Sequence, residues 1–358
     1  MKRVEILKTE NYFTRGAIIL QIPQKFKEIF LFQKNVIVKK AVLDSISKID
    51  TIVFDIDGVL IDVQDSFRNA ICQTVQCYFK KILKFDGKQR LIHPEEIAYF
   101  KMVGGFNNDW ELTSAVILFY LWKSEKSSTK NIDDLRSEIP ELKSFCTKTL
   151  NAGGGLQQVI EIFQRKNEFK KNIFKQWDNK QITRLFQEIY AGKENCYNIY
   201  HFHPSVTQSD GLYKNEKNIF DEKLKESLNN FSIGILTGRS NEETKIALEK
   251  LKWTGLLSEK QVMTSNKAVD KPNPEGLKKL STYLKTGLGL YIGDIRDDLL
   301  TTNNYNNKYR TTRFLSAIVL GGGFLQKESL VMMYLGEGVD FLAKDVNDIL
   351  KWILKNRM

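Results

Sequence analysis

The stretch Thr51–Leu60, TIVFDIDGVL, sets two aspartates directly after a short apolar run. Such a run ending in acidic residues predicts a buried parallel strand, and active sites of open α/β sheets lie just beyond these carboxyl ends. Asp55 and Asp57 are two residues apart, so in an extended chain their side chains point the same way. One carboxylate could attack while the other moves a proton, and together they suit Mg²⁺. A solvated turn is the alternative for this motif taken alone.

Two further motifs in the C-terminal half could serve an anion. Phe231–Ser240, FSIGILTGRS, is a second apolar strand that ends in Thr237 and Gly238. A hydroxyl and free backbone N–H groups after a strand end form a natural cradle for phosphate oxygens. In the following segment, DKPNP, two prolines hold Lys271 in a stiff loop. The alternatives are a plain turn and a solvated surface charge.

A third strand-like run, Leu290–Gly293, leads into Asp294, and Asp297 and Asp298 follow within one turn. A helix N-cap cluster is the alternative for these acids. The order Asp-x-Asp, Thr, Lys, Asp…Asp over separate strand ends favours one shared site over an accident of composition.

These motifs, FDIDGVL, LTGR, DKPNP and GDIRDD, resemble in sequence and in order the four motifs of the haloacid dehalogenase (HAD) superfamily. The resemblance covers residues 50–110 and 230–350. It implies that Asp55 is the nucleophile, and that Asp57 is the general acid/base and also lends a backbone carbonyl to Mg²⁺. Thr237, Gly238 and Lys271 would bind the phosphoryl group, with Lys271 also steadying Asp55. The implied metal ligands are Asp55, Asp57, Asp294 and Asp298, with Asp297 as an alternative to Asp298.

Asp57 also bears on the reaction type. Dehalogenases of this superfamily lack an acid at that position, whereas phosphatases and phosphomutases have one to protonate the leaving alkoxide. We therefore expect a Mg²⁺-dependent phosphohydrolase that releases phosphate from a small phosphorylated metabolite through an aspartyl-phosphate. The alternatives are a phosphomutase with the same motifs, or a non-catalytic binding or regulatory protein that keeps the fold.

A narrower resemblance runs from Ser66, Phe67 and Arg68 through KMVGGFNNDWEL at Lys101–Leu112, and GGGL at Gly153–Leu156 fits it as well. These segments look like a sparsely characterised HAD branch with a helical cap inserted after the first motif. The polar cluster in Lys101–Leu112 is either a helix N-cap or a cap loop that touches the substrate. Its candidate substrate contacts are Gly105, Asn107, Asn108 and Asp109.

The fold class expected is α/β, a doubly wound Rossmann-like parallel sheet with an inserted, mainly α-helical cap domain. Residues 47–63 and 229–358 would form the core and residues 64–228 the cap. Residues 1–46 would be an N-terminal extension containing strands, because apolar runs occur at 17–22, 29–32 and 36–38.

Composition limits the class of protein. The chain has 358 residues, 42% hydrophobic and 27% charged, which is typical of a globular protein with more than one domain. The apolar run Ala115–Trp122 is far shorter than the roughly 20 residues that span a bilayer, and the first residues mix acids and bases. The four cysteines lack metal-binding spacing. We expect a cytoplasmic protein with reduced thiols and no membrane partner.

The formal net charge of +11 raises the question of a polyanionic partner. The lysines are spread along the chain and no nucleic-acid motif is present, so a nucleic-acid partner is not expected. A modestly positive field would favour anionic phosphate esters. The sequence leaves open the identity of the substrate and whether the chain forms a homo-oligomer.

Overall fold

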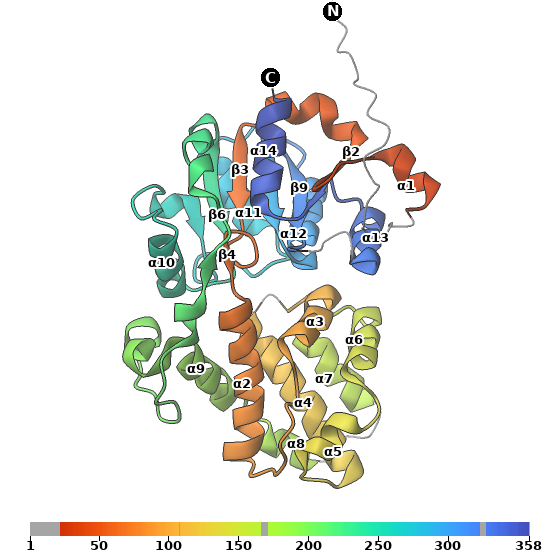
Figure 1. The fold of residues 1–358 in the computed structure, drawn as a ribbon, viewed down its shortest axis with the longest axis vertical. Coiled ribbons are helices and arrows are strands. Elements are labelled where there is room, and N and C mark those ends of the chain that lie inside the picture. Colours follow the sequence, from red (N-terminus) through yellow and green to blue (C-terminus); the bar gives the residue numbers. More distant parts are fainter. Residues whose placement is uncertain (1–21, 107, 166–170, 323–326, 358) are drawn as a thin grey trace, which may run out of the picture.

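The computed structural model describes residues 22–106, 108–165, 171–322 and 327–357. Within these residues the chain forms two lobes, an α/β core and a helical lobe, which lie one above the other in Figure 1. The helical lobe is inserted in the chain after the first strand of the parallel sheet.

The core is built on one sheet in which β3, the strand that carries Asp55 at its end, has a central place. The strand order is β1-β2-β10-β9-β8-β3-β6-β7. β3 pairs in parallel with β6 and β8, β9 is parallel to both β8 and β10, and β7 is parallel to β6. The bounds are β3 (Thr51–Phe54), β6 (Ser232–Leu236), β7 (Val262–Met263), β8 (Leu288–Gly293), β9 (Arg313–Val319) and β10 (Phe341–Ala343).

Helices cover both faces of this sheet. Ile52 and Phe54 of β3 belong to an apolar cluster that includes residues of α10 and α14, whereas Val53 packs with residues of α11 and α12 on the other face. This alternation follows from the period of two of a strand. α13 joins the second face beside β9 and β10. The helices are α10 (Asn241–Lys250), α11 (Glu275–Leu284), α12 (Arg296–Lys308), α13 (Glu328–Gly336) and α14 (Val346–Asn356). The doubly wound fold class predicted from the sequence is confirmed.

The N-terminal segment adds two antiparallel strands to the parallel sheet. β2 (Val36–Lys39) pairs with β10, and β1 (Phe30–Phe32) pairs with β2, after a short helix α1 (Gln24–Ile29). The apolar side chains of β2 are buried, which explains the apolar run at 36–38, and in the run at 29–32 Phe30 is buried whereas Ile29 is exposed. Residues 17–21 of the remaining run lie outside the described residues.

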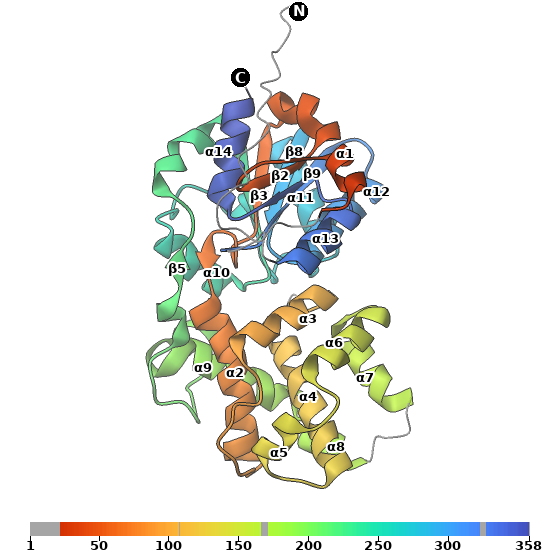
Figure 2. The same ribbon diagram turned by 45° about the vertical axis from the view of Figure 1, so that its right-hand side comes forward.

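The helical lobe, called the cap lobe below, packs around α4 (Asp109–Ser127), whose buried residues run without a break from Leu112 to Lys123. A helix that is apolar on all sides is buried on all sides, and Figures 1 and 2 both place α4 inside the lobe. The other helices are α2 (Asn69–Cys77), α3 (Ile97–Val103), α5 (Ile132–Ser137), α6 (Leu142–Asn151), α7 (Gly155–Arg165), α8 (Lys171–Gln176) and α9 (Asn179–Tyr200).

Two short antiparallel strands join the lobes, β4 (Ile61–Asp62) on the way out and β5 (Lys217–Asn218) on the return. Residues 219–228, which the sequence placed in the cap segment, pack on the core. The Phe220 ring lies 5.1 Å from that of Trp253, and the backbone N–H of Asp221 donates to Asn347.

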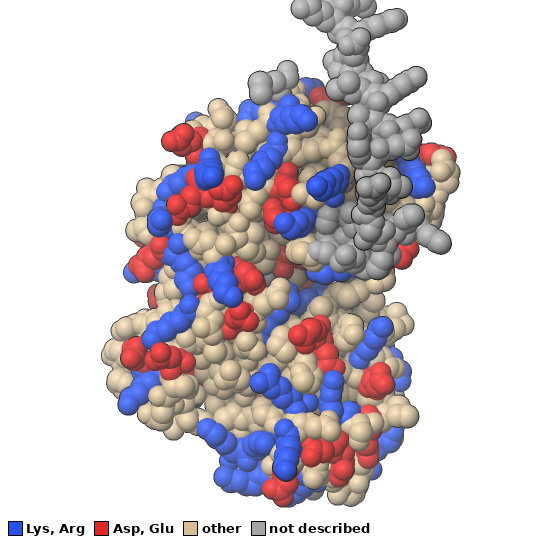
Figure 3. All heavy atoms as spheres, in the orientation of Figure 1, with Lys and Arg blue, Asp and Glu red and all other residues tan. Residues whose placement is uncertain are grey.

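No helix in the described part of the chain combines the length and apolar character that a bilayer crossing requires. On the face drawn in Figure 3, basic and acidic side chains are interspersed over both lobes. The net positive charge therefore does not form a single continuous stripe on this face.

Candidate active site

Asp55 extends the ladder of β3 by one residue and then ends it. Its backbone N–H donates to Ile292 of β8 at 2.9 Å, and its own Oδ1 accepts from the Ile56 N–H at 2.7 Å. The chain then turns at Gly58, which has φ +73°. A Cβ there would lie 2.1 Å from Asp294 Oδ2, so only glycine allows this close approach.

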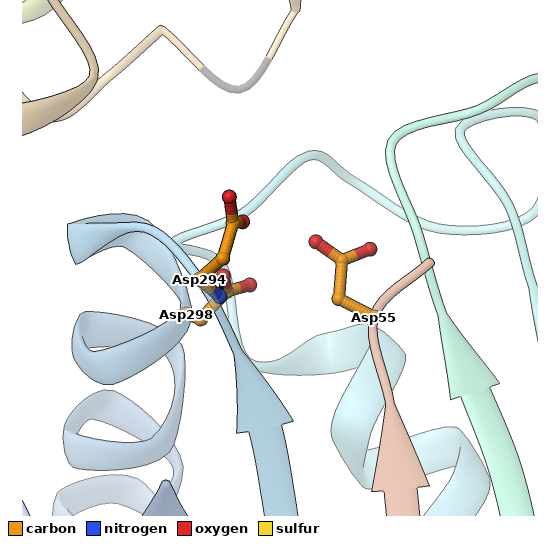
Figure 4. Close-up of side chains that lie close together, drawn as sticks. All are labelled: Asp55, Asp294 and Asp298. Carbon is orange, nitrogen blue, oxygen red and sulfur yellow. Dashed lines mark hydrogen bonds between the residues drawn. The ribbon is translucent and has the colours of Figure 1, made fainter. Parts of the chain in front are cut away.

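Three carboxylates from separate elements converge at this edge of the sheet. Asp55 follows β3, Asp294 follows β8, and Asp298 lies in the first turn of α12 (Figure 4). One oxygen from each lies within 4.8 Å of the others. Oxygen ligands at such spacing suit a hard divalent cation, and Mg²⁺ is bound in this way through a few carboxylates.

Lys271 ties two of these carboxylates together. Its Nζ lies 2.8 Å from Asp55 Oδ2 and 2.7 Å from Asp298 Oδ1, and its side chain is 3% exposed. Asp298 is held further by the Tyr291 hydroxyl at 2.7 Å and by the backbone N–H groups of Asp294 and Ile295. Asp298 is therefore fixed in place, whereas Asp297 is not part of this cluster.

The cluster holds more acidic than basic groups, with three carboxylates and the ammonium of Lys271. Burial raises the pKa of Asp55 to about 7, although Lys271 opposes the shift and Asp298 adds to it. Burial, then the charges of Asp298 and Asp55, hold the pKa of Asp294 well above its usual range. Burial alone would lower the pKa of Lys271, but the charges of Asp298 and Asp55 raise it well above its ordinary value. One ammonium among three carboxylates leaves an excess of negative charge that a divalent cation would balance, so the donor set fits Mg²⁺.

Asp57 does not join the cluster by its side chain; it is held by Arg239. The Arg239 guanidinium lies 2.6 Å from Asp57 Oδ1 and 2.9 Å from Glu216 Oε1. Arg239 is 1% and the Glu216 side chain 0% exposed, and the guanidinium also lies over the Phe67 ring. Tyr190 of α9 donates to the same Glu216 oxygen at 2.9 Å. Arg239 thus connects Asp57 to the returning linker and to the cap lobe.

Arg239 belongs to the LTGR motif, but the sequence motif alone assigned it no role. Its position two residues after Thr237 could have indicated that it lies near the site. Glu216 gave no such indication, because it lies in a polar stretch without a motif. Thr237 is buried, its Oγ1 accepts from the Arg239 N–H at 3.3 Å, and its own N–H donates to Met263. Gly238 lines the cavity described next, whereas Thr237 and Lys271 are buried and are not part of its lining.

A cavity of about 370 Å³ lies between the lobes above the cluster. The core contributes Asp55, Asp57 and Asp294, and the cap lobe contributes Lys101, Asn108, Asp109 and Trp110, among others. Lys101 pairs with Asp109 at 2.6 Å. Both lobes therefore contribute residues to the lining of the site.

The sequence left two interpretations for the polar cluster in the cap, and the side chain of Asn108 fits both. Its Oδ1 accepts from the Trp110 N–H at 3.1 Å, which caps α4, and the residue lines the cavity beside Asp109. Asn107 lies outside the described residues. Gly105 is not part of the cavity lining, and its role is a contact with the core.

That contact joins the loop after α3 to the start of α12. The Gly105 N–H donates to both oxygens of Asp297, at 3.0 and 2.9 Å, and Arg296 donates to the Val103 carbonyl at 3.3 Å. Gly105 has φ +73°, and a Cβ there would lie 2.8 Å from the backbone nitrogen of Gly155. Asp297 therefore anchors the cap lobe, while Asp298 belongs to the carboxylate cluster.

No family model matches this sequence, and no curated protein matches it. Among solved structures, a phosphatase, Tt82 from Thermococcus thioreducens, is 28% identical with a TM-score of 0.50, over 77% of this chain and 97% of that one. A structural-genomics target with no function in its name is 16% identical with a TM-score of 0.54, over 86% of this chain and 99% of that one. A HAD-superfamily hydrolase of subfamily IA from Geobacter sulfurreducens is 14% identical with a TM-score of 0.37, over 75% of this chain and 89% of that one.

Proposed function

We propose that this chain, which has the fold of the haloacid dehalogenase superfamily, is a Mg²⁺-dependent phosphohydrolase. Its substrate would be a small phosphorylated metabolite, and the reaction would pass through an aspartyl-phosphate on Asp55. One observation carries the proposal: Asp55, Asp294 and Asp298 converge at the carboxyl ends of β3 and β8, where Lys271 bridges Asp55 and Asp298 beneath a cavity that both lobes line. The similarity to a phosphatase supports the reaction class.

In the first step a carboxylate oxygen of Asp55 attacks phosphorus, a P–O bond forms, and the bond to the leaving oxygen breaks. The side chain is preset for this step, since Oδ2 is held by Lys271 and Oδ1 by the Ile56 N–H. Lys271 also offers positive charge for the phosphoryl oxygens. Mg²⁺ held by Asp55, Asp294, Asp298 and the backbone carbonyl of Asp57 would supply further charge neutralisation.

Asp57 handles the proton in both steps. It lines the cavity with its side chain 28% exposed, so it can reach a leaving oxygen there. In the first step it gives its proton to the leaving alkoxide. In the second step it takes a proton from water, whose oxygen attacks phosphorus and displaces Asp55. Arg239 sets the direction in which Asp57 points.

The test is the hydrolysis of nitrophenyl phosphate by the wild type and by Asp55→Asn. The variant should lose several orders of magnitude in turnover, because its amide is no nucleophile. Asp44→Asn, which changes an exposed aspartate outside the site, is the matched control. Activity of Asp55→Asn within about tenfold of the wild type, or about 1.4 kcal/mol, would contradict the proposal.

The metal is tested in the same assay. Activity should disappear with EDTA, return with Mg²⁺, and return poorly with Ca²⁺, whose larger and looser coordination shell misplaces the phosphoryl oxygens. Full activity after exhaustive chelation would contradict the metal assignment. A phosphomutase would release little inorganic phosphate. It would instead transfer the phosphoryl group from a phosphorylated donor to a second hydroxyl compound.

A further inference from the structure

The cavity above the carboxylate cluster has further basic side chains in its lining. Arg68 lies in the segment that leads from β4 into α2, Lys327 precedes α13, and Lys344 follows β10. These residues are far apart in the sequence and line the same cavity as Asp55 and Asp57. The proposed phosphoryl transfer gives none of them a role.

Two of these cations have no carboxylate partner. The Arg68 guanidinium forms no hydrogen bond or ion pair with any residue in the described ranges, although it is partly buried. Lys327 donates to the carbonyl of Leu320, and no acid among the described residues pairs with it. Lys344 differs, because it is half exposed and lies 3.5 Å from Asp345.

The other cavity cations are already paired. Lys101 contacts Asp109 at 2.6 Å, and Arg239 is shared between Asp57 and Glu216. Arg68 is partly buried, whereas Lys327 is exposed to solvent. An unpaired, partly buried cation is uncommon, because desolvation is costly without a partner. The contrast within a single cavity therefore singles out Arg68, and Lys327 is a second cation without a carboxylate partner in the same lining.

Arg68 and Lys327 also act on each other. Burial lowers the pKa of Lys327, and the positive charge of Arg68 lowers it further. The negative charge of Asp294 opposes this lowering. An anion between Arg68 and Lys327 would remove their repulsion.

We propose that Arg68 and Lys327 bind a second anionic group of the substrate, a carboxylate or a second phosphate at the end away from the scissile ester. This inference rests on the proposed function and narrows its substrate class to phosphorylated acids and bisphosphates. A planar guanidinium binds either group in a bidentate manner, and a lysine adds a point charge. The transferred phosphoryl group has its own partner in Lys271, and Mg²⁺ held by the carboxylate cluster would neutralise it further.

The test uses alkyl phosphates that differ only at the far end: propyl phosphate and the same ester ended by a carboxylate or by a second phosphate. We expect kcat/KM of the wild type to be at least about tenfold higher for the two esters with a second anionic group than for propyl phosphate. In Arg68→Gln and Lys327→Gln this ratio should fall towards one, mainly through KM.

Matched controls are Arg310→Gln and Lys355→Gln. Arg310 is an exposed residue in the turn between α12 and β9, at the opposite edge of the sheet, and Lys355 is exposed near the end of α14. Both variants should keep the wild-type ratio. They share the charge change of the test variants without touching the cavity lining.

A second measurement separates this inference from the proposed function. Propylphosphonate and its carboxylate-ended counterpart cannot be hydrolysed, so their binding to the Mg²⁺-loaded wild type can be measured by calorimetry. Tighter binding of the carboxylate-ended phosphonate than of propylphosphonate supports the subsite, provided that Arg68→Gln abolishes the difference. This result would count even if no ester is turned over. Equal affinity for both ligands overturns the inference. So does an equal loss on all three esters in Arg68→Gln, because Arg68 would then serve the transferred phosphoryl group. Absence of turnover with every ester would contradict only the proposed function.

Discussion

Replacing Asp55 by asparagine should raise the free energy of unfolding of the metal-free protein at pH 8 while it removes activity. Asp55 is 4% exposed, lies beside Asp294 and Asp298, and forms an ion pair with Lys271. An ionised carboxylate in that position is therefore unfavourable until a cation binds. The asparagine side chain keeps nearly the same shape and an oxygen for Lys271, but it carries no charge.

The size of the effect follows from the pKa of Asp55, which burial raises from 3.8 to about 7. At 1.36 kcal/mol per unit, about three units correspond to an upper limit of about 4 kcal/mol. This shift already includes the attraction to Lys271, so about 4 kcal/mol is the largest net gain that we expect. With an unfolding entropy of roughly 2.1 cal/mol/K per residue, the corresponding rise in Tm is at most about 5 °C.

The sign of the pH dependence is fixed by the direction of the shift. A pKa raised in the folded state contributes stability that is complete below the unfolded pKa and is lost as pH rises through the folded pKa. For Asp55 that window extends from about pH 4 to about pH 7. Asparagine does not titrate, so the advantage of Asp55→Asn over the wild type should grow from pH 5 to pH 8.

Scanning calorimetry in EDTA at these two pH values, with Asp44→Asn as control, measures the difference. Adding Mg²⁺ should then raise the Tm of the wild type more than that of Asp55→Asn, because the variant has lost a ligand. If Asp55→Asn were less stable than the wild type at pH 8, or if the difference did not change with pH, the electrostatic interpretation of the cluster would be wrong.

Three further predictions concern residues around the site. Asp57→Asn should lower kcat/KM for alkyl phosphates by about 10²–10⁴-fold. The loss for nitrophenyl phosphate should be much smaller, because nitrophenolate leaves with little need of protonation. Equal losses on both substrates would show that Asp57 is not the general acid. Asp297→Ala should raise KM, because it releases the Gly105 N–H from the core. Asp297→Asn keeps an acceptor for this N–H, so its KM should stay near that of the wild type. An unchanged KM in Asp297→Ala would show that this contact has no role in substrate binding. Deleting residues 1–46 exposes the edge of β10 and should reduce solubility, although any soluble product should keep metal-dependent activity; a soluble, equally stable product that loses nucleic-acid binding shown by the full chain would instead identify a binding arm.

The parts of the site that could be predicted are those at strand ends. Asp55 and Asp294 each follow a short apolar run, and the carboxyl ends of neighbouring parallel strands meet at one edge of a sheet. Lys271 could be predicted because prolines hold its loop after the second strand. The motif order was therefore enough to anticipate that these side chains meet, without knowledge of their distances.

The connection through Arg239 could not be predicted in this way. Its partners Asp57 and Glu216 lie 182 and 23 residues away, and Glu216 follows no motif. A buried carboxylate shows no distinct pattern in a polar segment, because solvent-exposed glutamates occupy similar stretches. Arg68 is comparable, since only the absence of a partner in three dimensions distinguishes it from an ordinary helix arginine.

The choice between Asp297 and Asp298 shows where sequence spacing reaches its limit. Consecutive helical residues point about 100° apart, so both acids cannot face Lys271. Which one does depends on where the turn after Asp294 starts the helix, and this is set by contacts rather than by spacing. In the structure Asp298 accepts the backbone N–H groups of Asp294 and Ile295, which turns its carboxylate towards Lys271 and Tyr291. Asp297 then points to the cap loop and accepts the Gly105 N–H. The first turn of α12 therefore has two roles: Asp298 belongs to the carboxylate cluster, and Asp297 binds the loop of the cap lobe.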